Sequence, residues 1–222
     1  MNHSVIHLAG ETLVPLPSAG LFWPDRDMLI VSDLHLGKSE RMARRGGDLL
    51  PPYETTATLE RLADDIASLQ PSTVLCLGDS FDDLDAARAL DTTHRATLAD
   101  LQTGRRWLWI EGNHDNASTD LGGTHLAQHH EGRLFFTHIA AKKPQTGEIS
   151  GHYHPKARIR GGSRRCFMTD ARRVICPAYG TYTGGLDWMT PVLRNLFDDR
   201  AMAFLTGHKV LQVPVPRYAG CR

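Results

Sequence analysis

Several short clusters of carboxylate, amide and imidazole side chains in this sequence could bind metal ions. Three clusters directly follow apolar runs of the kind that form buried strands, and two more lie further along the chain. The mixture of imidazole with carboxylate suits zinc, iron or manganese. No cysteine belongs to the set, which argues against a thiolate zinc site. The candidate ligands are Asp33, His35, Asp79, Asn113, His138, His152 and His154.

These seven side chains are too many for one tetrahedral ion, but they suit two ions that share one carboxylate. Two-metal sites hold their ions about 3.5–4 Å apart and stabilise both the attacking and the leaving oxygen of an in-line displacement. They also lower the pKa of a bound water from about 15.7 towards about 7, which provides hydroxide near neutral pH. The expected chemistry is therefore hydrolysis of a phosphate ester.

Two of the clusters place ligands two residues apart. In an extended segment, side chains at this spacing face the same way. We therefore expect Asp33 and His35 to point at one ion, and His152 and His154 to lie on one side of their segment.

The elements that must position the first three clusters alternate between strand and helix. Buried strands are predicted where the apolar runs occur, and helices where apolar residues recur at a spacing of three to four. Ligands of open α/β sheets bind in the crevice beyond the carboxyl ends of the strands, so the three clusters should meet there. The predicted strands are residues 28–32, 73–77 and 106–110, and the predicted helices are residues 51–69 and 83–101.

The remainder of the chain is predicted to be mostly strand, with one helical stretch around residues 190–197. Gly and Pro are scattered and do not gather into a linker, so we expect one domain over residues 1–222. The further predicted strands are residues 4–8, 12–14, 20–23, 133–137, 147–151, 156–160, 164–169, 172–176, 200–205 and 209–213.

Composition limits the class of protein. Lys plus Arg equals Asp plus Glu at 25 each, so the chain lacks a global basic field for nucleic acid. Arginine clusters at 41–45 and at 158–173 fit solvated surfaces and a phosphate track equally well.

The four cysteines show no paired framework, which indicates a reducing compartment, and Cys76 is expected in the core. Without a signal-like start or an apolar run of about 20 residues, we expect a cytoplasmic protein with no membrane contact.

Taken in order, the five clusters resemble the pattern of the calcineurin-like metallophosphoesterase superfamily, which is DxH, GD, GNH(D/E), H and GHxH, over positions 33 to 154. The resemblance implies a four-layer α/β/β/α sandwich with two mixed β-sheets and an active site at their edge. It implies that one ion is held by Asp33, His35, Asp79 and His154, and the other by Asp79, Asn113, His138 and His152. Asp79 would then bridge the two ions.

The same resemblance implies a catalytic role for the third cluster. His114 is similar to the family histidine that contacts the scissile phosphate and aids the leaving group. We expect Asp115 to orient His114, as a carboxylate often does for a histidine.

A narrower resemblance covers nearly the whole chain. The chain is similar to the bacterial ligase-associated DNA damage response endonucleases, the PdeM group. This resemblance implies a manganese-dependent nuclease that acts on single-stranded DNA. Such nucleases are encoded beside a helicase and an ATP-dependent DNA ligase. Members often carry His after the GDSF segment, where this chain has Asp82. The segments that carry the likeness are LFWP, SDLHLGK, LPPYET, LGDSF, WIEGNHD, GEISGHYHPKARI, RRCFMTD and PAYGTYTGGL.

Other polar residues near the motifs are candidates for substrate contact, namely Lys38, Asp82, Lys156 and Arg158. Trp107 and Trp109 alternate with apolar residues along a strand and are expected in the core rather than as platforms for bases. A turn is expected around Tyr182, and no chemistry is assigned to it. Two alternatives stay open, a phosphoesterase acting on a small nucleotide or a phosphoprotein, and a non-catalytic scaffold on the same fold.

Overall fold

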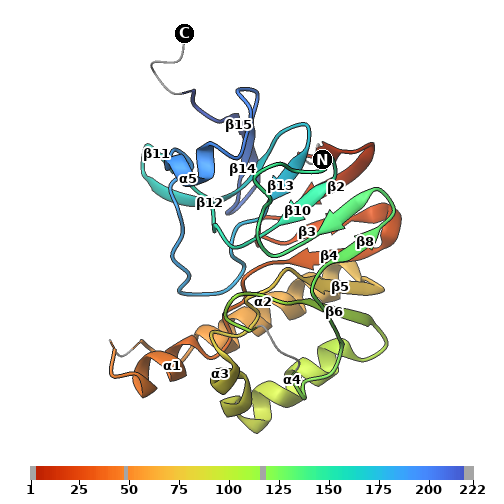
Figure 1. Ribbon diagram of the computed structural model, residues 1–222. Helices are drawn as coiled ribbons and strands as arrows, with labels where there is room; N and C mark the ends of the chain where they lie inside the picture. Colours follow the sequence, from red (N-terminus) through yellow and green to blue (C-terminus); the bar gives the residue numbers. More distant parts are fainter. Residues whose placement is uncertain (1–3, 48–49, 116–118, 218–222) are drawn as a thin grey trace.

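The computed structural model describes residues 4–47, 50–115 and 119–217, and it contains two β-sheets packed face to face (Figure 1). In the first sheet, the strands lie in chain order, with antiparallel pairing up to β4 and parallel pairing from β4 to β7. Its strands are β1 (Ile6–Leu8), β2 (Glu11–Pro15), β3 (Leu21–Trp23), β4 (Met28–Val31), β5 (Thr73–Cys76), β6 (Arg106–Ile110) and β7 (Thr124–Leu126).

The second sheet is also mixed. Its order is β15-β14-β12-β13-β10-β9-β8, and β9, β10 and β13 pair in parallel while the other neighbours are antiparallel. A further strand, β11 (Lys156–Ile159), pairs with β12 alone. The strands of the path are β8 (His129–Glu131), β9 (Leu134–Phe136), β10 (Glu148–Ser150), β12 (Gly162–Thr169), β13 (Arg173–Ile175), β14 (Met202–Leu205) and β15 (Leu211–Pro214).

Helices cover the outer face of the first sheet, below it in Figure 1. Leu59, Leu62 and Ile66 of α2 are buried in one cluster with Val31 and Val74 of the strands. Among the described residues, no helix is both long and apolar enough to cross a membrane. The helices are α1 (Lys38–Arg44), α2 (Glu54–Leu69), α3 (Leu84–Ala89), α4 (Thr92–Gln102), α5 (Pro191–Arg194) and the 3₁₀ turn η1 (Pro24–Arg26).

Two further apolar clusters define the remaining layers. Leu75 and Leu108 of the first sheet pack against Phe136 and Phe167 of the second, so the main core lies between the sheets. The other face of the second sheet is covered by a cluster that includes Leu193 of α5. The predicted four-layer α/β/β/α arrangement with two mixed sheets is confirmed, and its outermost layer is thin because α5 is short.

The prediction of one helix over residues 83–101 is wrong. Two helices replace it, because α3 ends at Ala89 and α4 begins at Thr92. The Asp91 side chain accepts a hydrogen bond from the backbone N–H of His94, and this N-cap starts a new helix. Leu90, between the helices, is buried at 8% exposure. The apolar spacing alone predicts one continuous helix, but this local cap divides the stretch into two helices.

The other predicted elements are observed with shifts at their ends, although the helix predicted around 190–197 is only four residues long. The strands β7 and β8 and the helix α1 have no counterpart among the predictions. Trp107 and Trp109 lie in the core at 3% and 2% exposure, as predicted. Cys76, Cys166 and Cys176 are free and buried, and Cys221 lies outside the described residues.

Backbone hydrogen bonds beyond the strand ends bring the loops of both sheets together. Within the first sheet, the N–H of Asp33 donates to the carbonyl of Gly78 at 3.2 Å. Between the sheets, the N–H of Tyr179 donates to the carbonyl of Ser32 at 2.7 Å. The segment after β13 is therefore anchored to the segment after β4, at the edge where the predicted ligands lie.

Candidate metal centre

The structure brings the predicted ligands together as two groups. In the first group, the ligand atoms of Asp33, His35 and His154 lie within 4.8 Å of one another. The second group consists of Asp79, His138 and His152 at the same separation. These groups match the division between two ions that the motif pattern implies.

Asn113, the seventh predicted ligand, lies against the second group. Its Oδ1 is 2.9 Å from Nε2 of His138. The two groups are also joined to each other, because the backbone N–H of His152 donates to Oδ2 of Asp33 at 3.0 Å. All seven side chains thus converge on one place, although they come from loops of both sheets.

The backbone at the ligands is not extended, so the expected reason for their convergence is wrong. Asp33 and His35 have φ of 52° and 47°, and His152 and His154 have φ of 67° and 45°. Asp79 has φ of 46°. All five lie in the left-handed region, which residues other than glycine seldom adopt and which is concentrated at functional sites. Tight left-handed turns, rather than strand alternation, aim these side chains inward.

Close backbone approach within the centre depends on glycine. A Cβ atom on Gly112 would collide with the backbone N and the carboxylate of Asp79, and one on Gly151 would collide with the hydroxyl of Ser32. These two glycines let the loops after β6 and β10 pack directly on Asp79 and on the residue before Asp33.

The electrostatics of the second group favour a bound cation. Burial raises the pKa of Asp79, but the hydrogen bond from His138 outweighs this effect and holds that pKa well below its usual value. Burial lowers the pKa of His138, yet Asp79 and Asp33 together raise it to about 9. Burial and the neighbouring His138 lower the pKa of His152. A protonated His138 therefore balances the carboxylates, and a divalent ion in the same place would balance them instead.

Unpaired buried atoms give a second test of whether metal ions fit. Nε2 of His35 is buried with no hydrogen-bond partner among the described residues, while the buried Oδ1 of Asp33 and Nε2 of His154 contact each other at 3.0 Å. In the second group, Nδ1 of His152 and Nε2 of His138 face each other at 3.3 Å. Buried polar atoms are normally satisfied, so these facing nitrogen and oxygen atoms fit coordination to ions.

The histidines are held by their second ring nitrogen. Nδ1 of His138 lies 2.8 Å from the carbonyl of Leu77. Nδ1 of His35 lies 2.9 Å from Oδ1 of Asp82. Because a carbonyl or a carboxylate can only accept, both Nδ1 atoms carry a proton, so Nε2 is the ring atom that would bind a metal ion, losing any proton it holds.

Comparison with known proteins settles the family. The family model of calcineurin-like phosphoesterases matches residues 27–209. The chain belongs to this family. It is therefore a hydrolytic, metal-dependent phosphoesterase, and the resemblance implied by the five motif clusters is confirmed.

The chain is also similar to solved structures. Pseudomonas putida nuclease MPE is similar at a TM-score of 0.75 and 27% identity, covering 96% of this chain and 100% of that chain. Yfce, a phosphoesterase from E. coli, is similar at a TM-score of 0.40 and 12% identity, over 85% of this chain and 99% of that chain. No curated protein matches the chain significantly.

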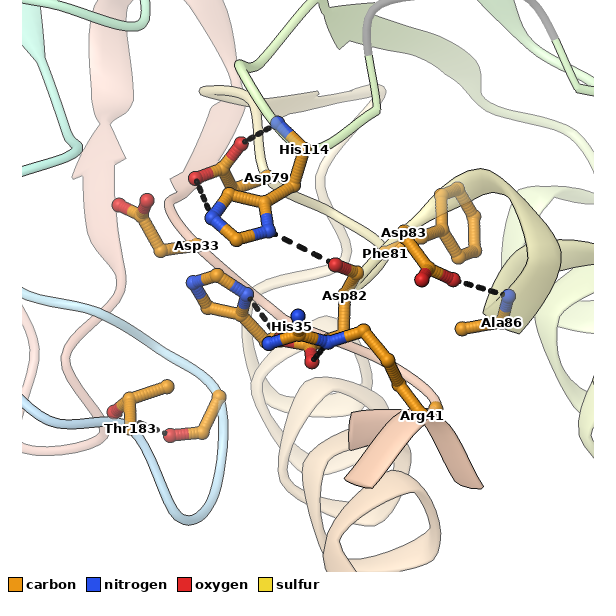
Figure 2. Close-up of polar contacts among 12 residues, drawn as sticks. Asp33, His35, Arg41, Asp79, Phe81, Asp82, Asp83, Ala86, His114 and Thr183 are labelled. Atoms are coloured by element: carbon orange, nitrogen blue, oxygen red, sulfur yellow. Dashed lines mark hydrogen bonds and ion pairs between the residues drawn. The ribbon is translucent and has the colours of Figure 1, made fainter. Parts of the chain in front are cut away.

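Asp82 does not have the position expected of a substrate-binding residue in this phosphoesterase. It is 1% exposed, and its two oxygens contact Nδ1 of His35 and Nε of Arg41 (Figure 2). Burial raises its pKa, but the hydrogen bonds from His35 and Arg41 prevail and lower it to about 2. Asp82 is thus an ionised carboxylate that orients His35. The sequence signal was its place after the GD motif, but its partners are visible only in three dimensions.

The expected contact between Asp115 and the His114 ring is also wrong. Both Asp115 oxygens accept from backbone N–H groups, those of Gly112 and of residues 79–81. Burial raises the pKa of Asp115 to about 6. The His114 ring is instead held through Nδ1, which lies 2.9 Å from the backbone carbonyl of Asp82 (Figure 2). Asp115 therefore ties the loops after β5 and β6 together.

The three predicted substrate-contacting cations lie in different environments. Lys38 is the first residue of α1, two positions beyond the short bridge between Leu36 and Phe81. Nζ of Lys156 donates to the carbonyl of Thr183 at 3.1 Å. The Arg158 side chain is 82% exposed, with Nε 3.8 Å from Asp187.

The arginine clusters are largely engaged within the protein. Arg41 contacts Asp82, while Arg44 and Arg45 both pair with Asp83. In the second cluster, Arg173 is fully buried beside Glu148 at 3.5 Å. Neither cluster as a whole forms a free cationic track.

Proposed function

We propose that this phosphoesterase is a nuclease that hydrolyses phosphodiester bonds of single-stranded DNA with two divalent metal ions. The observation that carries the proposal is the arrangement of two acid–histidine groups around one edge of the sandwich. The whole-chain likeness to a protein described as a nuclease supports DNA as the substrate class.

The ligands divide between the two ions according to the two groups. The first ion is assigned to Asp33, His35, Asp79 and His154, and the second to Asp79, Asn113, His138 and His152. This assignment is supported by the two sets of converging ligand atoms and by the contact of Asn113 with His138. Asp79, which contacts His138 and accepts from the backbone N–H of His114, would be the carboxylate that both ions share.

Mn²⁺ is the proposed metal, while the oxygen and imidazole ligands also accept Zn²⁺ or Fe²⁺. The PdeM-group likeness of the sequence favours manganese. It also supports a role in bacterial DNA repair in the cytoplasm, with a helicase and an ATP-dependent DNA ligase as functional partners.

Bound metal ions supply Lewis-acid stabilisation of the phosphate oxygens and a water of lowered pKa. We propose that His114 aids the leaving oxygen. Because Nδ1 donates to the carbonyl of Asp82, Nε2 can donate a proton only from the doubly protonated ring. Nε2 faces the metal ligand Asp79, with its Oδ2 4.0 Å away. The proposed role of His114 is therefore general acid.

The test is an assay on metal-depleted protein with Mn²⁺, Zn²⁺ or Fe²⁺ added back. Circular single-stranded DNA, a phenyl phosphodiester and a phosphomonoester are compared side by side. The proposal expects Mn²⁺-stimulated cleavage of the circular DNA, which has no ends and so reports endonuclease action. Cleavage of small esters with intact circular DNA would contradict it.

One alternative keeps specific support. The zero net charge of the chain fits a small nucleotide or a phosphoprotein as well as DNA, because such substrates need no extended basic surface. The same three-substrate assay decides between them. The scaffold alternative has no such support, since all seven predicted ligands and His114 are present.

A further inference from the structure

The loop after β13 lies against the first metal group at both of its ends. Near its start, the N–H of Gly180 donates to the carbonyl of Asp33 at 3.1 Å. Near its end, Gly185 packs so closely on the carbonyl of His154 that a side chain there would collide with it. This segment, residues 179–185, is named the rim loop, and it runs between two predicted ligands of one ion. Figure 2 shows Thr183 of this loop on the same side of the site as Asp33 and His35.

Two arginines hold the rim loop in place. Arg165 donates to the carbonyl of Gly180 at 2.6 Å and to the hydroxyl of Thr183 at 3.2 Å. Arg61 donates to the hydroxyl of Thr181 at 3.0 Å. The residues on either side of Tyr182 are therefore fixed by charged donors.

Tyr182 itself differs from its clamped neighbours. It is 40% exposed, and among the described residues no hydrogen bond or ring contact engages its side chain. Its φ is 56°, a left-handed conformation that is unfavourable for a bulky residue and that persists only where the surroundings impose it. Tyr182 is thus an exposed aromatic residue, without a side-chain partner among the described residues, on a loop whose two ends contact Asp33 and His154.

We propose that Tyr182 is a stacking platform for a nucleobase of the single-stranded nucleic acid bound at the metal centre, an inference that rests on the proposed nuclease function. An exposed aromatic ring combined with cationic side chains is the arrangement that binds single strands without reading sequence. Lys156, which contacts the rim loop, and the exposed Arg158 on the same strand supply the cations. A site that contacted only the phosphates of the strand would gain no binding energy from an aromatic ring.

The experiment measures competition against cleavage of a fluorescent single-stranded DNA reporter by the metal-loaded protein. One competitor is a thymidine oligonucleotide of about 12 nucleotides, a length within the range of single-strand sites. The other is an abasic oligonucleotide of the same length and charge. Wild type, Tyr182→Ala and Tyr182→Phe are compared. Tyr182→Gly is added because glycine relieves the backbone strain, so that loss of a contact is separated from loss of folding.

Wild type is expected to prefer the thymidine competitor. Tyr182→Ala and Tyr182→Gly should weaken that competitor by roughly 5-fold or more, the lower end of the range for base stacking, while the abasic competitor changes less than about twofold. Tyr182→Phe should behave as wild type because it keeps the ring.

Three results would overturn the inference. They are equal weakening of both competitors, no weakening of either, and a Tyr182→Phe protein that behaves as Tyr182→Ala, which would assign the effect to the hydroxyl. If the wild-type protein leaves the reporter uncut, the proposed nuclease function fails first and the stacking role falls with it.

Discussion

The two metal groups differ in what holds their histidines. In the first group, Nδ1 of His35 contacts one oxygen of the ionised Asp82 carboxylate. Arg41 forms an ion pair with the other oxygen. In the second group, His138 is held by the neutral backbone carbonyl of Leu77. A carboxylate partner increases the basicity of a coordinating imidazole more than a neutral partner does. We therefore expect the first group to bind its ion more tightly, and to be the one that side-chain substitutions can weaken selectively.

The largest expected effect comes from the carboxylate that the two groups share. Asp79→Ala should release both ions and lower turnover by about 10⁴-fold or more, because metal stabilisation contributes several kcal/mol and each 1.36 kcal/mol is a factor of ten. Elemental analysis and an initial-rate assay measure the two effects. The exposed Glu60→Ala is the control. Retention of one full ion would show that the groups bind independently.

The next largest effect is on the catalytic rate and leaves metal binding intact. His114→Ala should lower kcat by about 10²–10⁴-fold, the usual contribution of a general acid, with nearly unchanged metal content. The matched control is His130→Ala, an exposed histidine of β8. Loss of metal in the His114 variant would mean that this histidine belongs to the ligand set.

Asp82→Ala tests the difference between the groups directly. It should weaken binding of one of the two ions by about 10–100-fold, as loss of the partner of a metal-bound histidine does, and leave the other ion in place. A two-phase Mn²⁺ titration monitored by calorimetry and by activity resolves the two ions. Asp85→Ala removes a carboxylate that is 62% exposed on α3 and serves as the control. An equal change in both phases would remove the proposed asymmetry.

The smallest effect is on packing around the first group. Gly180→Ala would place a Cβ against the carbonyl of Leu34, between Asp33 and His35. Overpacking of this kind costs about 1–3 kcal/mol, so Tm should fall by about 2–12 °C. Gly184→Ala has open space around its Cβ position and should leave Tm unchanged. If both variants melt like the wild type, the contact between rim loop and first group is looser than described.

The sequence predicted that the seven candidate ligands lie close together, because such ligands are defined by residue type and by their place after a strand. Both properties are local. All seven predicted ligands converge, and the two mixed sheets are observed. The break near Leu90 was missed because helical spacing continues through it, whereas the cap by Asp91 is a single hydrogen bond.

The roles of the neighbouring carboxylates were not predictable in the same way. Asp82 and Asp115 both lie next to motif residues, yet one holds His35 and the other holds backbone N–H groups. Which atoms a buried carboxylate meets depends on loops that are distant in sequence.

The amino-acid sequence by itself determined the ligand types, their order and the strands that carry them, because hydrophobic periodicity and side-chain chemistry are properties of short segments. Only the tertiary structure decided that five ligands adopt left-handed backbone, that Asp82 supports His35, and that Tyr182 is exposed on the rim loop. These features arise from contacts between segments such as Ser32 and Tyr179, and long-range contacts of this kind leave no pattern in neighbouring residues.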